Sequence, residues 1–432
     1  MRTATGPVHA RDTVSSLVQR GLSAAGIMIA ATVVSNAANY VYSLVMGRML
    51  GPSVFGGFTA LLGVLMILSV ASQSVQAVVA RYTAGMRKEL GDGAVSAFAR
   101  RLVGRLTLVG IGCFALWLPL TFVLDGALHF EDRLPVIAAG SALILAFTLP
   151  VVWGALQGEQ RFGPLGASMV LLAVGRLGIG VGLVAVGASL TGAIGALTIA
   201  TALAFAVGYP ALLRSGGGEP SEGKVGPPAR EMIRYGLPAV IGLAAWTLLT
   251  NLDVVIVKAM AASEEAGYYG AAATVGKMAL FLPLAFGLVI FPKAAARHVA
   301  GIDSRVLMRR AGQLLLGVSV VFVAAVAVAG DLAIRLMFGE EFEPAGELVV
   351  PVVAAMCCFA IANVMLFYYL SVHRMRFAAV MFGVVAIQVA ALFAFGSDPL
   401  AAAYVQLVVG LAVIAVNEIF FVPLVRPLGG SR

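Results

Sequence analysis

The chain has 432 residues, of which 60% are hydrophobic and only 12% are charged. Because soluble domains carry charge on about a quarter of their residues, this composition excludes an ordinary soluble enzyme or binding module. Backbone groups cannot stay unpaired in hydrocarbon, and the long unbroken apolar runs lack the alternation of a β-barrel. The sequence therefore predicts an all-α polytopic membrane protein.

About twelve apolar segments reach the roughly 20 residues that a helix needs to cross a bilayer. They leave only short connections and no separate soluble domain. Trp117 and Trp153 fall near the ends of two segments, where tryptophans commonly anchor a helix at the membrane interface. In chain order the predicted spans are 24–47, 55–80, 103–124, 134–155, 164–187, 191–213, 236–259, 268–292, 311–330, 347–370, 376–396 and 400–424.

The positions of lysine and arginine predict the orientation, because loops on the cytoplasmic side carry most basic residues. With the N-terminus inside, 23 of the 29 basic residues fall in inside segments. Four fall outside, at Arg48, Arg133, Lys258 and Arg335, and the outside loop 331–347 is acidic. We therefore expect a multi-pass protein of the cytoplasmic membrane with both termini in the cytoplasm. The net charge of +8 then reflects topology, and nucleic acid is not an expected partner.

A segment rich in Gly, Pro and Ser follows Arg214 and has the composition of a flexible linker. It predicts a first lobe of six helices over 1–213, a cytoplasmic linker over 214–235, and a second lobe of six helices over 236–432. Each half opens with a similar hairpin, in which a helix interrupted by polar residues ends on a basic residue, Arg48 or Lys258. Such internal repetition is typical of transporters built from two related halves.

Polar side chains inside the predicted spans are the main functional clue, because charges and amides at bilayer depth normally face a bundle interior or a wet cavity. In the first span they recur on a single helix face, and spans 2 and 7 carry similar groups. One interpretation is that they hydrogen-bond helix to helix; the other is that they line a hydrated central cavity. The cavity candidates are Asn36, Asn39, Tyr40, Gln73, Gln76, Asn251 and Asp253.

Two cations lie too deep in their predicted spans to reach an interface, Arg176 in span 5 and Lys277 in span 8. At 1.5 Å per residue they sit at similar depth in opposite halves. Two buried cations would repel each other unless an anion bridged them, so the pair predicts a site for a phosphate or carboxylate group. The alternative is a structural ion pair between one of them and Asp253.

The stretch Arg48-Met-Leu-Gly-Pro-Ser-Val-Phe-Gly56 resembles the turn between helices 1 and 2 in the polysaccharide-exporter branch of the multidrug, oligosaccharide-lipid and polysaccharide flippase superfamily. The hairpin at Leu252–Lys258 and Ala266–Tyr269, with Ile290–Lys293, is similar to its equivalent in the second lobe. The positions that carry the resemblance are Arg48, Gly51, Pro52, Phe55, Gly56, Lys258, Gly267, Tyr268 and Pro292.

This resemblance implies a V-shaped cavity between two lobes related by a pseudo-two-fold axis. It further implies alternating access that moves an undecaprenyl-pyrophosphate-linked saccharide across the membrane, with H⁺ or Na⁺ as a coupling ion. No cofactor, metal or catalytic residue is expected, and no nucleotide-binding Gly-x-x-x-x-Gly-Lys-Ser/Thr loop occurs. In this reading Arg176 and Lys277 meet the pyrophosphate and the polar stripes receive the sugars.

Two other functions stay open at this stage. A cation-coupled exporter of drugs or metabolites is suggested by Asp253 and disfavoured by Asn36 and Asn39, which stand where such exporters usually carry an embedded acidic residue. A membrane-bound glycan polymerase would need a large outside loop with catalytic residues, and the longest predicted outside loop has under about twenty residues.

Overall fold

The computed structural model describes residues 8–130, 132–214, 229–281, 305–371 and 376–421, and most of their side chains from residue 26 onward. All regular structure in these ranges is helical, which confirms the predicted fold class. The elements are α1 (Val8–Leu90), α2 (Asp92–Leu128), α3 (Leu134–Ser141), α4 (Leu143–Ala146), α5 (Thr148–Gly158), α6 (Phe162–Leu183), η1 (Val184–Ala188), α7 (Ser189–Leu213), α8 (Ala229–Met260), α9 (Ser263–Gly276), η2 (Lys277–Phe281), α11 (Arg305–Phe338), η3 (Glu340–Ala345), α12 (Gly346–Ser371), α13 (Arg376–Phe395) and α14 (Pro399–Phe420).

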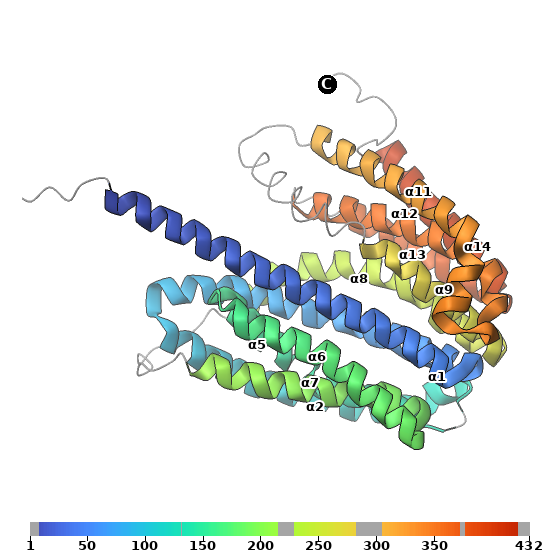
Figure 1. The fold of residues 1–432 in the computed structure, drawn as a ribbon, viewed down its shortest axis with the longest axis horizontal. Coiled ribbons are helices and arrows are strands. Elements are labelled where there is room, and N and C mark those ends of the chain that lie inside the picture. The colour runs from blue at the N-terminus through green and yellow to red at the C-terminus, as the bar shows by residue number, and fades with distance from the viewer. Residues whose placement is uncertain (1–7, 131, 215–228, 282–304, 372–375, 422–432) are drawn as a thin grey trace, which may run out of the picture.

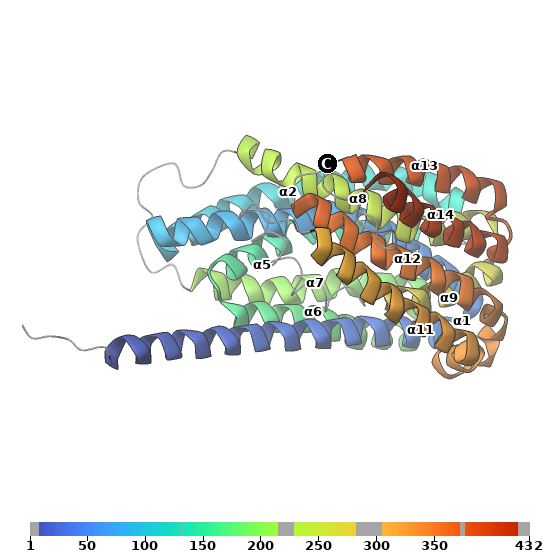
Figure 2. The ribbon, with the colours of Figure 1, turned by 90° about the horizontal axis from the view of Figure 1, so that it is seen from above.

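The element α1 contains two helices joined by a sharp turn at Gly51. This glycine has φ 70° and ψ 169°, a conformation that glycine adopts without the steric cost of a Cβ. Pro52 follows, and a proline is tolerated in the first turn of a helix because its missing N–H would be unpaired there in any case. The first arm of α1 (8–50) and the second arm (52–90) consequently run in opposite directions from the turn, and they diverge away from it (Figures 1 and 2).

The predicted spans agree with the observed helices. Nine helical stretches in the described residues are long and apolar enough to cross a membrane. Two of them, Gly26–Leu90 and Phe162–Leu213, have 65 and 52 residues, enough for two crossings each, and they turn at Gly51 and at Gly187, where φ is 94°. Of the eighth predicted span, 268–281 is helical in α9 and η2, and 282–292 lies outside the described residues.

Two details differ from the sequence prediction. Residues 229–235, predicted as linker, already belong to α8, because this turn packs on α1: Tyr82 donates a hydrogen bond to Glu231 at 3.1 Å. Trp117 is not an interfacial anchor, since it is only 5% exposed and donates from Nε1 to the Val136 carbonyl at 2.8 Å. Gly140 leaves the space that this indole ring fills.

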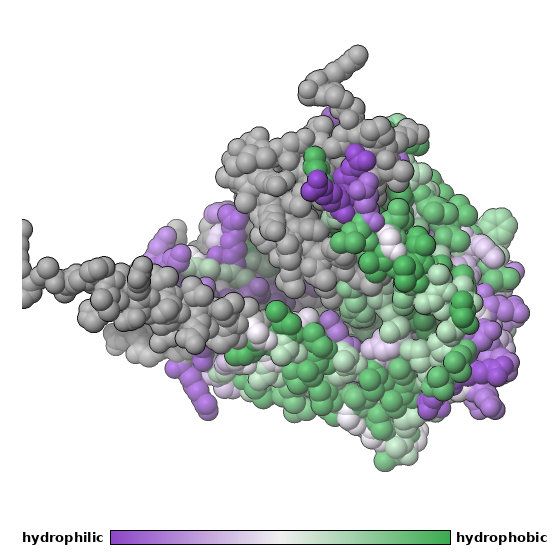
Figure 3. Space-filling model, turned by 45° about the horizontal axis from the view of Figure 1, so that its top comes forward, coloured by the Kyte–Doolittle hydropathy of each residue, from purple (hydrophilic) through white to green (hydrophobic). Residues whose placement is uncertain are grey.

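The helices form two groups, α1–α7 and α8–α14, which meet most closely where the second arm of α1 packs against α8 and α9 (Figure 1). Large apolar side chains remain exposed, among them Leu116 at 75% and Val328 at 91%. Figure 3 shows hydrophobic residues covering the middle of the visible face, with hydrophilic residues toward its ends. An apolar belt of this size on a helical bundle indicates contact with lipid.

Candidate functional site

A buried polar cluster lies in the second group of helices, around the end of α9. Lys277, the first residue of η2, donates from Nζ to the Asn251 side-chain oxygen at 2.9 Å. The amide nitrogen of Asn251 in turn donates to the Thr247 carbonyl at 2.9 Å and to the Thr250 hydroxyl at 3.0 Å, which fixes the orientation of the amide. Lys277 therefore takes an amide, rather than the Asp253 carboxylate, as its hydrogen-bond partner.

The Asp253 carboxylate is fully buried beside this cluster. The Tyr269 hydroxyl donates to its Oδ2 at 2.9 Å, while Oδ1 has no hydrogen-bond partner. Lys277 is near enough to interact electrostatically with the carboxylate. Since an ionised carboxylate accepts several hydrogen bonds, Asp253 retains unused capacity for a cation or a proton.

Two glutamines that the sequence analysis did not select extend the cluster onto α13 and α14. Gln388 donates from Nε2 to Gln406 Oε1 and to the Leu249 carbonyl, each at 2.9 Å, and Tyr269 interacts with both Asp253 and Gln406. Both glutamines are 0% exposed. The signal that could have found them is the one used for Asn251: an amide in the middle of a predicted span.

A buried cation lies in the first group of helices. The Arg176 guanidinium on α6 stacks over the Tyr42 ring, 4.3 Å from the centroid, and the residue is only 7% exposed. Its Nε and Nη2 have no hydrogen-bond partner. Tyr42 itself donates to the Ala193 carbonyl and fits against α6 because Gly180 has no side chain. Arg176 is thus held by an aromatic face, and two of its charged donor atoms are buried without an acceptor among the described residues.

Arg176 and Lys277, predicted to share one anion, each have a partner within their own group of helices in this structure. Tyr42 holds Arg176 on the side of α1 and α6, and Asn251 holds Lys277 on the side of α8. That the two cations act on one substrate remains a prediction.

The polar stripe on the first arm of α1 lies beside its packing face. Ala38 and Tyr42 are buried, whereas Asn36 and Tyr40 are half-buried and Asn39 is exposed. The Tyr40 hydroxyl has no hydrogen-bond partner. That hydroxyl is itself buried, so Asn39 is the accessible member of these three polar residues, and their role as cavity lining stays a prediction.

The glutamines of the second arm differ from each other. Gln73 is exposed, and among the described residues its side chain bonds only to Ser69, one turn earlier, at 3.3 Å. Gln76 donates to Gln157 on α5 at 3.2 Å, which is the helix-to-helix role considered as the alternative. Of this pair, Gln73 keeps the polar atoms that a ligand could use.

The residues of the family motif gather at the turn end of α1, where the two groups of helices meet. Arg48 donates from Nε to the Met337 carbonyl at 2.9 Å and also to the Leu336 carbonyl. These carbonyls lie at the end of α11, where helix carbonyls lack partners and attract a cation. Arg48 therefore joins α1 to the second group of helices.

Phe55 is fully buried in this contact, with its ring centroid 5.6 Å from that of Phe338 and 5.7 Å from that of Phe342. Tyr268 meets Phe342 edge-on at 6.4 Å. Lys258 donates to the Ser263 hydroxyl at 3.2 Å and lies 5.9 Å from the centre of the Phe130 ring. Aromatic side chains thus fill the interface between α1, α9 and α11.

Glycines bring the two backbones together at the same place. A Cβ on Gly56 would lie 2.9 Å from the Ala266 carbonyl carbon, and one on Gly267 would collide with the Pro52 carbonyl oxygen. We call this contact of Arg48, Pro52, Phe55, Gly56 and Gly267 with their partners the turn-end seam. Pro292, also assigned to the motif, lies outside the described residues.

The fold is similar to those of solved transporters. An inward-facing multidrug-resistance MATE-family transporter of the MOP superfamily matches with a TM-score of 0.66 at 12% identity, over 90% of this chain and 99% of that chain. The lipid II flippase MurJ in an inward closed conformation matches with 0.65 at 10% identity, over 90% and 87%. An outward-facing MATE-family transporter gives 0.55 at 14% identity, over 91% and 93%.

The two-lobed helical fold is similar to the fold of MOP-superfamily transporters. A family model described as polysaccharide biosynthesis protein matches residues 22–296, well over half of the chain. The chain therefore belongs to the polysaccharide biosynthesis protein family, as the motif residues predicted. A comparison with curated proteins finds no significant match.

Proposed function

We propose that this protein is a flippase that moves an undecaprenyl-pyrophosphate-linked oligosaccharide across the cytoplasmic membrane for the synthesis of cell-surface polysaccharide. The observation that carries the proposal is the buried Arg176 guanidinium with two nitrogens unpartnered, in a member of a polysaccharide biosynthesis family. A buried cation with open donors is costly in lipid, and a phosphate oxygen is the acceptor that a guanidinium binds best.

The second lobe contributes a complementary set of groups. Lys277 and Asn251 supply an ammonium and an amide at one point, and the stripe at Asn36, Asn39 and Tyr40 supplies groups that match sugar hydroxyls. In alternating access, rotation of one lobe against the other changes which of these groups the substrate meets. Arg176 and Lys277 then bind the pyrophosphate in turn or together.

The described conformation supports access from one side. The turn-end seam closes the end of the molecule that carries Arg48, which the charge pattern predicts to lie outside. The fold matches an inward-facing MATE transporter better than an outward-facing one, with TM-scores of 0.66 and 0.55. Both observations favour a state that is open toward the cytoplasm.

The test is flipping of a labelled undecaprenyl-pyrophosphate saccharide by the full chain in proteoliposomes. Arg176→Ala and Lys277→Ala should each reduce the initial rate at least about tenfold, because a charge-assisted hydrogen bond contributes roughly 1.5–3 kcal/mol. Arg176→Lys keeps the positive charge but cannot form a bidentate contact with a phosphate, so it should retain an intermediate rate.

Arg133→Ala is the matched control for this test. It also removes an arginine, but an exposed one, whose Nε lies 3.1 Å from Asp125, so flipping should stay at the wild-type rate. Thermal unfolding in detergent identifies variants that merely fail to fold. Wild-type flipping rates in both folded alanine variants would refute the assignment of the two cations.

A cation-coupled exporter of drugs or metabolites is the second candidate, favoured by the open Oδ1 of Asp253. Asp253→Asn keeps the acceptor for Tyr269 but removes the negative charge. If this candidate holds, the variant abolishes dye efflux driven by a Na⁺ or H⁺ gradient and leaves saccharide flipping unchanged. A different outcome would assign Asp253 as the coupling site of the flippase. In that case flipping by the wild type depends on the gradient, and Asp253→Asn loses flipping.

A further inference from the structure

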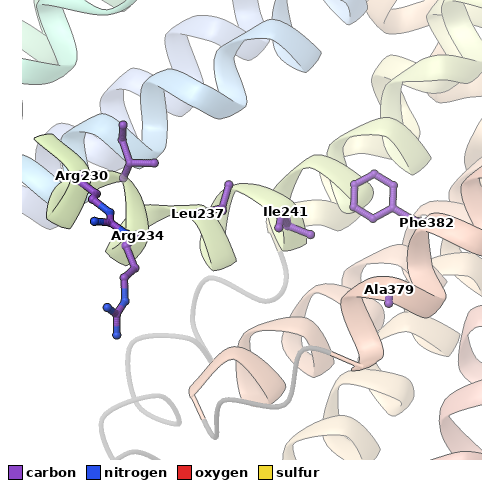
Figure 4. A pocket seen from close by; sticks show the side chains of 7 residues that line it. Arg230, Arg234, Leu237, Ile241, Ala379 and Phe382 are labelled. Atoms are coloured by element: carbon purple, nitrogen blue, oxygen red, sulfur yellow. The ribbon is translucent and has the colours of Figure 1, made fainter.

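A groove lies on the side of α8 that faces away from α1. It encloses about 850 Å³ between the start of α8 and α13. On α8 its lining residues are Arg230, Ile233, Arg234, Leu237 and Ile241, spaced so that they lie on one helix face. Figure 4 shows this row along α8, with Ala379 and Phe382 on the facing α13.

The two ends of the groove differ in chemistry. Arg230 and Arg234, both exposed, stand at the end nearest the linker, and neither forms an ion pair with a described residue. The remaining lining is apolar and accessible, with Leu237 50% and Phe382 37% exposed. From Arg234 to Ile241 the helix rises roughly 10 Å, about a third of the hydrocarbon thickness.

The opposite face of α8 has another role. There Glu231 accepts a hydrogen bond from Tyr82 at 3.1 Å, and Gly236 packs against Val78, both on the second arm of α1. The groove is thus separate from the helix face that joins the two lobes, and it lies outside the cluster around Lys277 and Asp253.

We propose that this groove binds an anionic phospholipid of the adjoining leaflet, with its phosphate between Arg230 and Arg234 and an acyl chain along Leu237, Ile241 and Phe382. Charge complementarity selects this occupant: two guanidinium groups that form no ion pair with a described residue match a phosphate at the polar end. The apolar wall continues from them into the depth of the bilayer. A soluble anion would leave the wall empty, and a neutral lipid would leave the arginines unpaired.

The test measures binding of dioleoyl-phosphatidylglycerol to the full chain in detergent by native mass spectrometry, with dioleoyl-phosphatidylcholine for comparison. At about one kcal/mol per basic residue near an anionic surface, Arg230→Gln with Arg234→Gln should weaken phosphatidylglycerol binding roughly tenfold or more and abolish the preference over phosphatidylcholine. Ala379→Trp, which fills the apolar part and keeps both arginines, should weaken binding of both lipids.

The matched control is Arg100→Gln with Arg101→Gln. It removes two exposed arginines of α2 that the charge pattern places on the same side of the membrane, and it should leave binding unchanged. An equal loss in this control would overturn the proposal in favour of diffuse electrostatic attraction. Full competition by inorganic phosphate would overturn it in favour of a head-group site alone. Displacement by undecaprenyl phosphate at a much lower concentration than by phosphatidylglycerol would reassign the groove to the transported lipid.

Discussion

Gly267 illustrates how a single residue sets the distance between the lobes. It stands where the backbone of α9 approaches Pro52, so close that any side chain would meet the Pro52 carbonyl oxygen. The loss of helix propensity that glycine brings, about 1 kcal/mol relative to alanine, is offset here by the approach of two backbones. The motif residue is therefore explained by packing rather than by contact with a substrate.

Gly267→Ala should destabilise the protein by about 1–3 kcal/mol, as overpacking of a tight contact does. The measurement is thermal unfolding of the purified protein in detergent. Gly178→Ala on α6 is the control, because nothing lies within 4 Å of a Cβ at that position, and it should be neutral or slightly stabilising. An unfolding temperature of Gly267→Ala at or above that of the control would contradict the packing argument.

At this scale the sequence predicted part of the candidate site. Arg176 and Asp253 were placed inside membrane spans, and they lie within α6 and α8; that they line a substrate cavity stays a prediction. Gln388 and Gln406 were not predicted as site residues. The sequence spacing of a single amide in an apolar span does not indicate which neighbouring helix the amide will face. Their pairing depends on how α13 packs against α14, which is a tertiary property.

Among the elements, α1 shows how one residue converts a long apolar run into two crossings. The described chain is helical on both sides of Gly51, and only its positive φ turns the chain back. The Gly-Pro pair in the sequence predicted this turn. The close packing of the second arm against α8 and α9 could not be predicted from the sequence. Small residues permit such contact without specifying which helix is the partner.

Gly51→Ala should strain this turn, since its φ of 70° and ψ of 169° lie in a region essentially restricted to glycine, which costs other residues about 1–3 kcal/mol. The neighbouring space is open, with only Glu341 Oε2 within 4 Å, so the effect should come from backbone conformation alone. Gly104→Ala in α2, a helical site with nothing nearby, serves as the reference in the same unfolding measurement. Equal stability of the two variants would show that the turn tolerates a side chain.

For the whole molecule, the turn-end seam has to open if the lobes exchange access between the two sides. Thr59 on α1 and Gly270 on α9 face each other across it, and a Cβ at Gly270 would lie 3.2 Å from that of Thr59. This is slightly below the usual Cβ separation of a disulfide, so a small shift allows a bridge.

Thr59→Cys with Gly270→Cys, in a chain whose native cysteines are replaced, should form a disulfide and stop flipping until it is reduced. The control pair, Ser141→Cys with Thr198→Cys, joins α3 and α7 within one lobe, where the hydroxyl oxygens lie 2.8 Å apart. That bridge should leave the rate unchanged. Full flipping by the oxidised seam variant would show that the seam does not move during transport.

Composition and the length of its apolar runs determined by themselves that this protein is a helical bundle in lipid, because hydrocarbon leaves the backbone no other way to pair its polar groups. The turn motif also predicted the family. The tertiary structure alone decided which buried groups meet: Lys277 with Asn251, Arg176 with Tyr42, and Gln388 with Gln406. The physical reason is that the free-energy cost of burying a polar group depends on the group itself. The identity of its partner depends on how each helix is rotated and how the helices cross. Close contacts between residues far apart in the sequence determine that rotation and crossing.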